Sequence, residues 1–257
     1  MKYYVVADVH GYFDELQAAL TEQGYFMDSE RHKLVVCGDL FDRGKQAKEL
    51  QTFILDLLEK DEVILIRGNH EDLAVELLHD WPQGGYLRSY HHSNGTVGTV
   101  CQLTGLSVAE LLSNPEAAGR EFLHTPYMQT LIPAMQDYYE TPHYIFVHGW
   151  IPCALTRLGR HEVQYASFDN WRAATPEAWE AARWLNGMEA AHGGVTEPGK
   201  TIVCGHWHCS FGHAHYEGRG GEFDNDPDFT PYYGNGIIAL DACTPVSGRV
   251  NCIVVRD

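Results

Sequence analysis

Five short polar segments, each placed directly after a run of apolar or β-branched residues, constrain the fold of this 257-residue chain more than any other feature. They are residues 8–10 (DVH), 38–44 (GDLFDRG), 68–71 (GNHE), 147–149 (VHG) and 205–208 (GHWH). Short apolar runs bounded by such polar turns are typical of buried strands. Loops at the carboxyl ends of sheet strands are where open α/β folds assemble their sites. The sequence therefore predicts that side chains far apart in the chain converge at one point.

The first 75 residues alternate between strand and helix patterns. Apolar runs at 3–7, 34–36 and 63–66 indicate strands, and apolar residues at helical spacing between them indicate helices. Right-handed crossovers would make these three strands a parallel core. We therefore expect an α/β protein that forms one domain over residues 1–257.

The pattern changes between about residues 80 and 142, where Gly, Pro, Tyr and His are frequent and the helical pieces are short. We interpret this segment as a helical and loop cap inserted into the domain. Its polar and aromatic cluster comprises Tyr86, Arg88, Tyr90, His91, His92 and Asn94. Strand patterns return at 144–147, 201–204, 237–240 and 251–255, and the last two are predicted to form a hairpin through residues 244–248.

Charge and composition narrow the classes of partner. The formal net charge is -17, and the 18 Lys and Arg residues are scattered, which argues against nucleic acid and anionic membranes as partners. An anionic substrate would then require a local positive centre, which bound divalent cations supply. No apolar stretch approaches the length of a membrane span or of a signal-peptide core, so we expect a cytoplasmic protein. The seven cysteines form no CxxC pair and are expected to be reduced thiols, and the oligomeric state is left open.

The polar segments contain a mixture of carboxylate, imidazole and amide groups that suits manganese, iron or zinc. The predicted donors are Asp8, His10, Asp39, Asn69, His148 and His206. Asp8 and His10 lie two residues apart and point to the same side of a strand end. A two-metal site needs a shared carboxylate, and Asp39 is the candidate. Any one of these residues alone would more readily be a turn-capping Asp or a buried His, but five segments in order favour a metal site.

This series of motifs resembles that of the phosphoprotein phosphatase (PPP) family of calcineurin-like metallophosphoesterases, especially the bacterial and phage-type serine/threonine phosphatases. The family pattern is GDxHG, GDxxDRG, GNHE and two later histidines, and here only the opening Gly is replaced, by Ala7. The resemblance implies a β-sandwich of two mixed sheets flanked by helices. It also implies two divalent ions, with manganese expected and iron or zinc as alternatives. One ion would be held by Asp8, His10 and Asp39, and the other by Asp39, Asn69, His148 and His206.

The same resemblance assigns roles to the residues beside the ligands. A hydroxide activated by the two metals would attack phosphorus in line, so that no phosphorylated enzyme is required. His70 is the candidate acid for the leaving group, with Asp42 holding its imidazole charged and oriented. Arg43 and Asn69 are expected to contact the substrate, and the Arg43 guanidinium can grip two phosphoryl oxygens.

Two positions depart from the family pattern. Arg183, in the segment ARWLNG, is the candidate for a second phosphate-binding arginine, and a helix-surface arginine covering apolar neighbours is the alternative. His208 follows His206 at the GHxH spacing of the wider superfamily and would complete the ion held by Asp8 and His10. A plain loop histidine is the alternative for His208.

Three functions follow from these observations. The first is a metal-dependent phosphomonoesterase acting on phosphoserine or phosphothreonine in proteins, or on small phosphoesters. The second is hydrolysis of a dinucleoside tetraphosphate, in which the aromatic cap would stack a base. The third is a catalytically silent phosphate-binding scaffold, which is disfavoured because every predicted donor and His70 are present.

Overall fold

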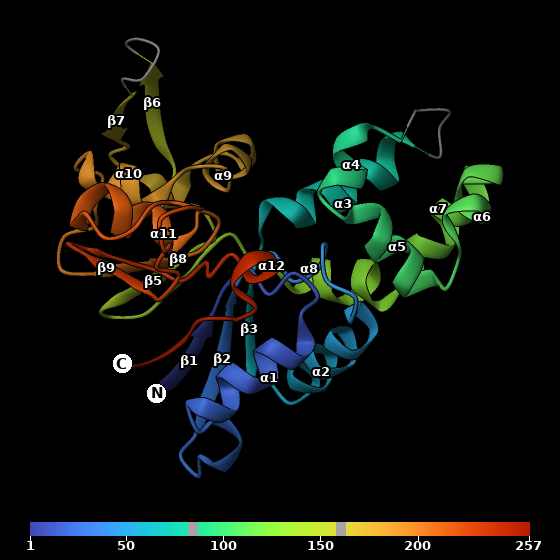
Figure 1. The fold of residues 1–257 in the computed structure, drawn as a ribbon, viewed down its shortest axis with the longest axis horizontal. Helices are drawn as coiled ribbons and strands as arrows, with labels where there is room; N and C mark the ends of the chain where they lie inside the picture. Colours follow the sequence, from blue (N-terminus) through green and yellow to red (C-terminus); the bar gives the residue numbers. More distant parts are fainter. Residues whose placement is uncertain (82–86, 158–162) are drawn as a thin grey trace.

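Two β-sheets pack face to face in the computed structural model, which describes residues 1–81, 87–157 and 163–257 (Figure 1). The first sheet has the strand order β11-β1-β2-β3. Its strands are β1 (Lys2–Val6), β2 (His32–Cys37), β3 (Val63–Ile66) and β11 (Cys252–Arg256). The strands β1, β2 and β3 are parallel, as the sequence predicts, and β11 is antiparallel to β1.

The second sheet is also mixed and has the order β4-β5-β8-β10-β9. Its strands are β4 (Tyr139–Glu140), β5 (Tyr144–Phe146), β8 (Thr201–Cys204), β9 (Tyr232–Gly234) and β10 (Ile237–Ala239). The central strands β5, β8 and β10 are parallel, and β4 and β9 form antiparallel edges. A separate antiparallel pair joins β6 (Cys153–Arg157) and β7 (Val163–Ser167). The predicted α/β fold with two mixed sheets is confirmed.

The two-residue period of the strands divides the apolar side chains among three layers. In β1, Tyr3 and Val5 belong to the cluster between the sheets, together with Phe146 and Val203 from the second sheet. The alternate residues Tyr4 and Val6 face the other side and pack in the cluster that holds α1 (Phe13–Glu22) and α2 (Ala47–Glu59). Both faces of β1 are therefore buried, which explains its nearly continuous apolar sequence.

The outer face of the second sheet is covered in the same way. Ile145, Ile202 and Ile237 share a buried cluster with Trp179 and Met188. These last two residues lie on α9 (Pro176–Ala182) and α10 (Gly187–His192), and the short α11 (Cys209–Gly212) follows on the same side. The architecture is thus a sandwich of two sheets with helices on both outer faces (Figure 1).

The described part of the segment that the sequence predicts to be a cap is mostly helical, and its end contributes β4 to the second sheet. After α3 (Asn69–Asp80), its helices are α4 (Ser89–Ser93), α5 (Thr96–Thr104), α6 (Val108–Ser113), α7 (Pro115–Leu123) and α8 (Ile132–Ala134). Val97 and Val100 of α5 belong to the same core cluster as the buried residues of α2, so the segment is packed onto the domain. Its assignment as a cap stays a prediction, and Tyr86 of the predicted aromatic cluster lies outside the described residues.

The predicted hairpin at the C-terminal end is wrong. β10 and β11 belong to different sheets, and the link between them contains the helix α12 (Thr244–Ser247). The two strands do not pair with each other. Instead, β10 pairs with β8 in parallel, and β11 completes the first sheet beside β1. Short-range turn signals alone do not reveal such long-range pairing.

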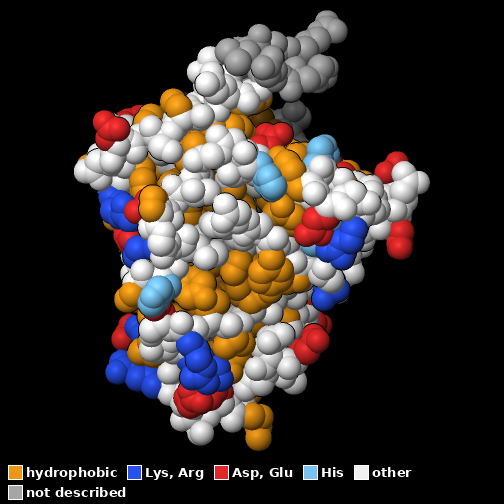
Figure 2. Space-filling model, turned by 90° about the vertical axis from the view of Figure 1, so that its left-hand side faces the viewer, with side chains coloured by type: hydrophobic (Ala, Val, Ile, Leu, Met, Phe, Trp, Pro, Cys, Tyr) orange, Lys and Arg blue, Asp and Glu red, His pale blue; other side chains and the backbone are white. Residues whose placement is uncertain are grey.

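The charged side chains are dispersed over the viewed face (Figure 2), and the cysteines are free thiols. Figure 2 shows small separate groups of basic and acidic side chains on the viewed face rather than one basic stripe. All seven cysteines are free, and five of them are buried. None of the described helices combines the length and the apolar character that crossing a bilayer requires.

An ion-pair network around Glu140 makes the stability of the second sheet dependent on pH. The Glu140 carboxylate accepts hydrogen bonds from Arg172 at 2.6 and 2.8 Å, and Lys200 Nζ lies 2.9 Å from it. These partners lower the pKa of Glu140 to about 2, against an ordinary value near 4.5. Because the folded-state pKa is depressed, this stabilisation is present above pH 4.5 and is lost as the pH falls towards 2.

We therefore expect the melting temperature of Glu140→Gln to lie below that of the wild type at pH 6, and the gap between them to narrow between pH 5 and pH 2. Calorimetry at several pH values measures this gap. Glu121→Gln, which removes an exposed carboxylate on α7, is the control and should melt like the wild type throughout. A gap for Glu140→Gln that stayed constant over this pH range would contradict the assignment.

Candidate metal centre

Each predicted ligand segment lies at the carboxyl end of a parallel strand. Asp8 follows β1, Asp39 follows β2, and Asn69 follows β3 as the first residue of α3. In the second sheet, His148 follows β5 and His206 follows β8. Because the two sheets face each other, these five strand ends meet near α12 (Figure 1).

The backbone at these strand ends is unusual. Left-handed conformations, with φ between 48° and 73°, occur at Asp8, His10, Asp39, Asp42, Arg43, His206 and Cys243. Non-glycine residues seldom adopt this region, and when they do so together the surrounding packing must hold them there. Such concentrated strain is a feature of functional sites rather than of ordinary turns.

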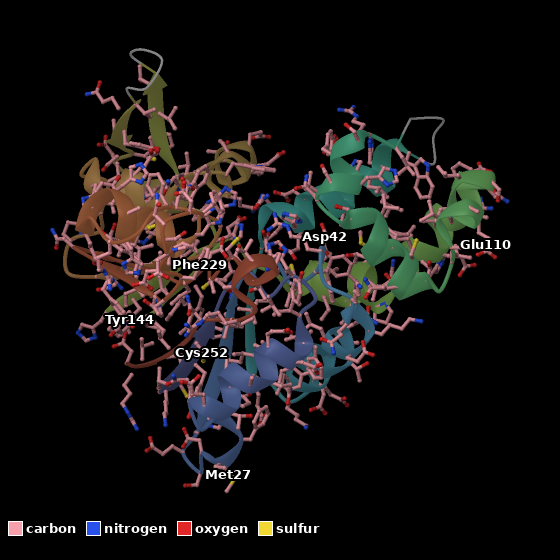
Figure 3. All side chains as sticks on the ribbon, in the orientation of Figure 1. Met27, Asp42, Glu110, Tyr144, Phe229 and Cys252 are labelled. Atoms are coloured by element: carbon pink, nitrogen blue, oxygen red, sulfur yellow. The ribbon has the colours of Figure 1, made fainter. Side chains whose placement is uncertain are left out.

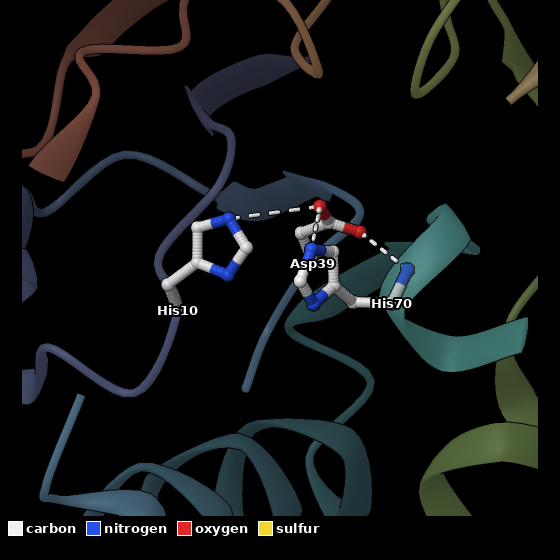
Figure 4. Close-up of side chains that lie close together, drawn as sticks. All are labelled: His10, Asp39 and His70. Atoms are coloured by element: carbon white, nitrogen blue, oxygen red, sulfur yellow. Dashed lines mark hydrogen bonds and ion pairs between the residues drawn. The ribbon is translucent and has the colours of Figure 1, made fainter. Parts of the chain in front are cut away.

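Two groups of buried side chains are arranged around Asp39. His10, Asp39 and His70 form one group, and Asp39, His148 and His206 form the other, in which His206 is half-buried. The nearest nitrogen and oxygen atoms of each group lie within 4.8 Å of one another. His10 Nε2 lies 3.6 Å and His70 Nε2 3.8 Å from Asp39 Oδ2, as Figure 4 shows. His148 Nε2 lies 3.4 Å from the other oxygen, Oδ1. Asp39 therefore occupies the shared position that a bridging carboxylate requires.

Backbone carbonyl groups fix the orientation of two imidazoles. His10 Nδ1 lies 2.9 Å from the carbonyl oxygen of Phe41, and His148 Nδ1 lies 2.9 Å from that of Cys37. Since a carbonyl oxygen only accepts, each Nδ1 carries the proton and donates. In a neutral imidazole Nε2 then has its lone pair directed into the site, which is the usual arrangement of metal-ligating histidines.

The contacts of Asn69 test whether a cation fits this cluster. Its Oδ1 lies 2.7 Å from His148 Nε2 and 2.9 Å from His206 Nδ1. With Nδ1 of His148 protonated, two electron-pair acceptors face each other at 2.7 Å. A cation coordinated by both atoms resolves this conflict.

The electrostatics of the buried groups point the same way. Burial, aided by the nearby Asp241 and Asp39 carboxylates, raises the pKa of Asp8 well above its ordinary value. Burial also lowers the pKa of His10 to about 4 and that of His206 to about 3, so both imidazoles are neutral at pH 7. Neutral imidazoles and crowded carboxylates are the donor set that binds divalent cations, and the residues present fit a pair of them.

His70 lies beside this cluster with two further partners. Its Nδ1 is 2.7 Å from Asp42 Oδ2, and its Nε2 is 3.2 Å from Arg43 Nη2. Burial disfavours the charged imidazole, but the Asp39 and Asp42 carboxylates outweigh it and raise the pKa of His70. The structure therefore brings together the three residues to which the sequence assigns acid, orienting and phosphate-gripping roles. Arg43 is exposed and accessible to a ligand.

Two threonines hold Asp42 in place through contacts that the sequence does not predict. Thr99 Oγ1 donates to Asp42 Oδ1 at 2.6 Å, and Thr96 Oγ1 donates to Oδ2 at 2.8 Å. Both residues lie on α5, so the predicted cap reaches the centre through them (Figure 3). Gly95, with φ of 92°, makes this approach possible, because a Cβ there would lie 2.3 Å from the Arg43 backbone nitrogen.

Two buried acids are further residues that sequence reasoning missed. Glu71 accepts hydrogen bonds from the backbone N–H groups of Gly68, Asp39 and Leu40, and thus ties two ligand loops together. Asp241 is buried and raises the pKa of Asp8, as described above. It lies two residues beyond β10, which is the same position that Asp39 and His206 occupy after their strands. That spacing is the signal by which the sequence reveals Asp241.

The two residues that depart from the family pattern have other partners in the structure. His208 Nδ1 lies 3.6 Å from Asp241 Oδ2, and His208 Nε2 lies 3.6 Å from Glu222 Oε1. Among the described residues it does not join either of the two groups around Asp39, so metal ligation by His208 stays a prediction.

Arg183 is buried and pairs with two carboxylates, Asp72 at 2.8 Å and Asp137 at 2.5 Å. The alternative of a helix-surface arginine is therefore wrong, because these carboxylates draw the guanidinium inwards. Its contact with phosphate stays a prediction.

Comparison with known proteins places this geometry in context. The chain matches the family described as calcineurin-like phosphoesterase over residues 1–210. It is 32% identical over 116 residues to the asymmetrical bis(5'-nucleosyl)-tetraphosphatase PrpE of Bacillus velezensis, covering 43% of this chain and 44% of that protein. It is 40% identical over 79 residues to a symmetrical bis(5'-nucleosyl)-tetraphosphatase of Psychromonas ingrahamii, covering 31% and 27%. The matches thus span less than half the length of these curated relatives.

A solved structure shares the fold over a greater length. The cold-active protein-tyrosine phosphatase of a psychrophilic Shewanella species superposes with a TM-score of 0.51 at 17% identity. The superposition covers all of this chain and 75% of that protein. At this identity the likeness concerns the fold alone.

Proposed function

Because the chain belongs to the calcineurin-like phosphoesterase family, we propose that it is a metal-dependent hydrolase that cleaves the phosphate chain of a dinucleoside tetraphosphate. The observation that carries the chemistry is the position of Asp39 between His10 and His70 on one side and His148 and His206 on the other. The names of the curated relatives supply the substrate class.

Two divalent ions would be held by residues from both sheets. The first sheet would provide Asp8, His10, Asp39 and Asn69, and the second would provide His148 and His206. When bound, the pair of ions lowers the pKa of water and offsets the negative charge of the phosphoryl group. We expect manganese, with iron or zinc as alternatives.

The protein's own side chains complete the reaction. His70 would protonate the departing phosphate oxygen through Nε2, while Asp42 holds Nδ1 and keeps the imidazole oriented. Thr96 and Thr99 fix Asp42 in turn. The exposed guanidinium of Arg43, 3.2 Å from His70 Nε2, would bind oxygens of the phosphoryl group as charge builds up there.

A protein substrate has weaker support than the sequence motifs suggest. The curated relatives carry names for dinucleoside tetraphosphates, and the protein phosphatase of known structure is similar in fold only. The relatives therefore favour the second of the functions that the sequence left open.

The test is a side-by-side assay of the metal-loaded protein on diadenosine tetraphosphate and on a phosphoserine peptide. We expect kcat/KM to be at least about tenfold higher for diadenosine tetraphosphate, which corresponds to about 1.4 kcal/mol of differential transition-state binding. Chromatography of the products separates asymmetrical cleavage, to ATP and AMP, from symmetrical cleavage to two ADP. Faster hydrolysis of the phosphopeptide would instead favour the protein phosphatase.

A further inference from the structure

Trp184 is the exposed tryptophan at the candidate metal centre. All six tryptophans lie in the described part of the chain; four are buried and Trp207 is half-buried, whereas Trp184 has 49% of its surface exposed. Its ring lies 5.8 Å from that of His206, centroid to centroid, at an interplanar angle of 83°. An open indole surface thus adjoins a residue of the candidate centre.

The turn at the end of α9 holds the backbone of Trp184 in this position. The backbone N–H of Trp184 donates to the carbonyl of Ala181 at 3.1 Å, which continues the end of α9. Arg183, directly before it, is fixed by its ion pairs with Asp72 and Asp137. The same turn packs tightly against Gly149, where a Cβ would lie 2.7 Å from the carbonyl oxygen of Arg183. These contacts fix the turn that presents the indole beside His206.

We propose that Trp184 is the platform on which a nucleobase of the substrate stacks. This inference rests on the proposed function, since it concerns the same site. In a nucleotide, one ribose separates the base from the first phosphate. A base stacked on Trp184 therefore leaves the phosphates beside His206. Stacking is also suited to a chain with a net charge of -17, because it binds the neutral part of a polyanionic ligand.

The aromatic residues of the predicted cap are less suited to this role. The Tyr90 hydroxyl donates to Glu76, and the guanidinium of Arg88 lies 5.8 Å from the centre of the Tyr90 ring. His91 is buried. Tyr90 and His91 are thus engaged within the protein, whereas Trp184 combines exposure with a position at the centre.

The experiment compares Trp184→Ala and Trp184→Phe with the wild type on two substrates. Diadenosine tetraphosphate carries bases, and inorganic tripolyphosphate has the same anhydride bonds without a base. We expect Trp184→Ala to raise KM for diadenosine tetraphosphate about tenfold or more, with kcat within about twofold and KM for tripolyphosphate unchanged. Trp184→Phe should retain most of the affinity, because a phenyl ring still stacks.

Phe26→Ala is the matched control. Phe26 is 47% exposed and precedes Met27, which Figure 3 labels at the far end of the molecule from Asp42. The Phe26→Ala substitution should leave KM unchanged for both diadenosine tetraphosphate and tripolyphosphate. Circular dichroism melts confirm that the variants are folded.

A binding measurement keeps the inference testable without turnover. Titration with AMP should quench the tryptophan fluorescence of the wild-type protein, and this quenching should be lost in Trp184→Phe. Equal changes in KM for both substrates, or no change for either, would overturn the role of Trp184 while leaving the hydrolase intact. If the protein hydrolysed tripolyphosphate but not diadenosine tetraphosphate, the proposed function would fail, and the AMP titration alone would then decide the inference.

Discussion

Replacing Asp39 by asparagine is expected to lower kcat/KM for diadenosine tetraphosphate by about 10³-fold or more. Asp39 is the carboxylate that both groups of side chains share, and its two oxygens face His10 and His70 on one side and His148 on the other. Asparagine keeps the shape but removes the charge and one oxygen acceptor. Loss of several kcal/mol of charge stabilisation translates into a rate loss of this size. The hydrolysis rate and the metal content per chain, by plasma mass spectrometry, are the measurements.

Asp61→Asn is the matched control for this substitution. Asp61 also adopts a left-handed conformation, with φ of 56°, but it pairs with Lys33 at the surface. Its replacement should change neither the rate nor the metal content. An Asp39→Asn protein that kept two ions per chain and more than about a tenth of the wild-type rate would refute the bridging role.

His70→Asn is expected to lower kcat by about 10² to 10⁴-fold while leaving the metal content unchanged. The size is that of a general acid, because His70 would protonate the leaving oxygen and is not among the expected ligands. A loss of this size is expected for phosphoesters with a basic leaving group. It should shrink for p-nitrophenyl phosphate and for diadenosine tetraphosphate, whose leaving groups need little protonation. A series of aryl phosphates of graded leaving-group pKa measures this dependence.

His192→Asn is a suitable comparison. His192 stacks on Tyr216 at 3.5 Å and bonds to the Tyr232 hydroxyl, in the cluster behind the second sheet. It should reduce stability without altering the dependence on the leaving group. A His70→Asn protein whose loss was the same for every leaving group would show that His70 is not the acid.

The parallel core could be predicted from the sequence, and so could the strand ends at which the candidate donors lie, because both depend on local patterns. β1, β2 and β3 are short apolar runs, and the polar residue after each run is the one that the strand end presents. The same reasoning extends to Asp241 after β10, which the sequence analysis passed over because no family motif marked it.

Features that depend on long-range packing could not be predicted. The separation of β10 from β11 is decided by partners that lie far away in the chain. The contacts of Thr96 and Thr99 with Asp42 join residues 54 and 57 positions apart, and the local sequence does not indicate these contacts. The ion pairs of Arg183 with Asp72 and Asp137 are likewise invisible without the fold.

The candidate metal ligands are divided between the two sheets. For the proposed hydrolase, this division links activity to the packing of one sheet on the other. Neither sheet alone carries all the candidate ligands. His148 and His206 belong to the second sheet and Asp39 to the first, with the apolar cluster between the two sheets separating them. A partially assembled chain that keeps each sheet but loosens the seam would retain much of its secondary structure and yet lack the centre. Enzymatic activity would thus depend on the packing of the two sheets, and it would be lost before the circular dichroism signal of the secondary structure changes.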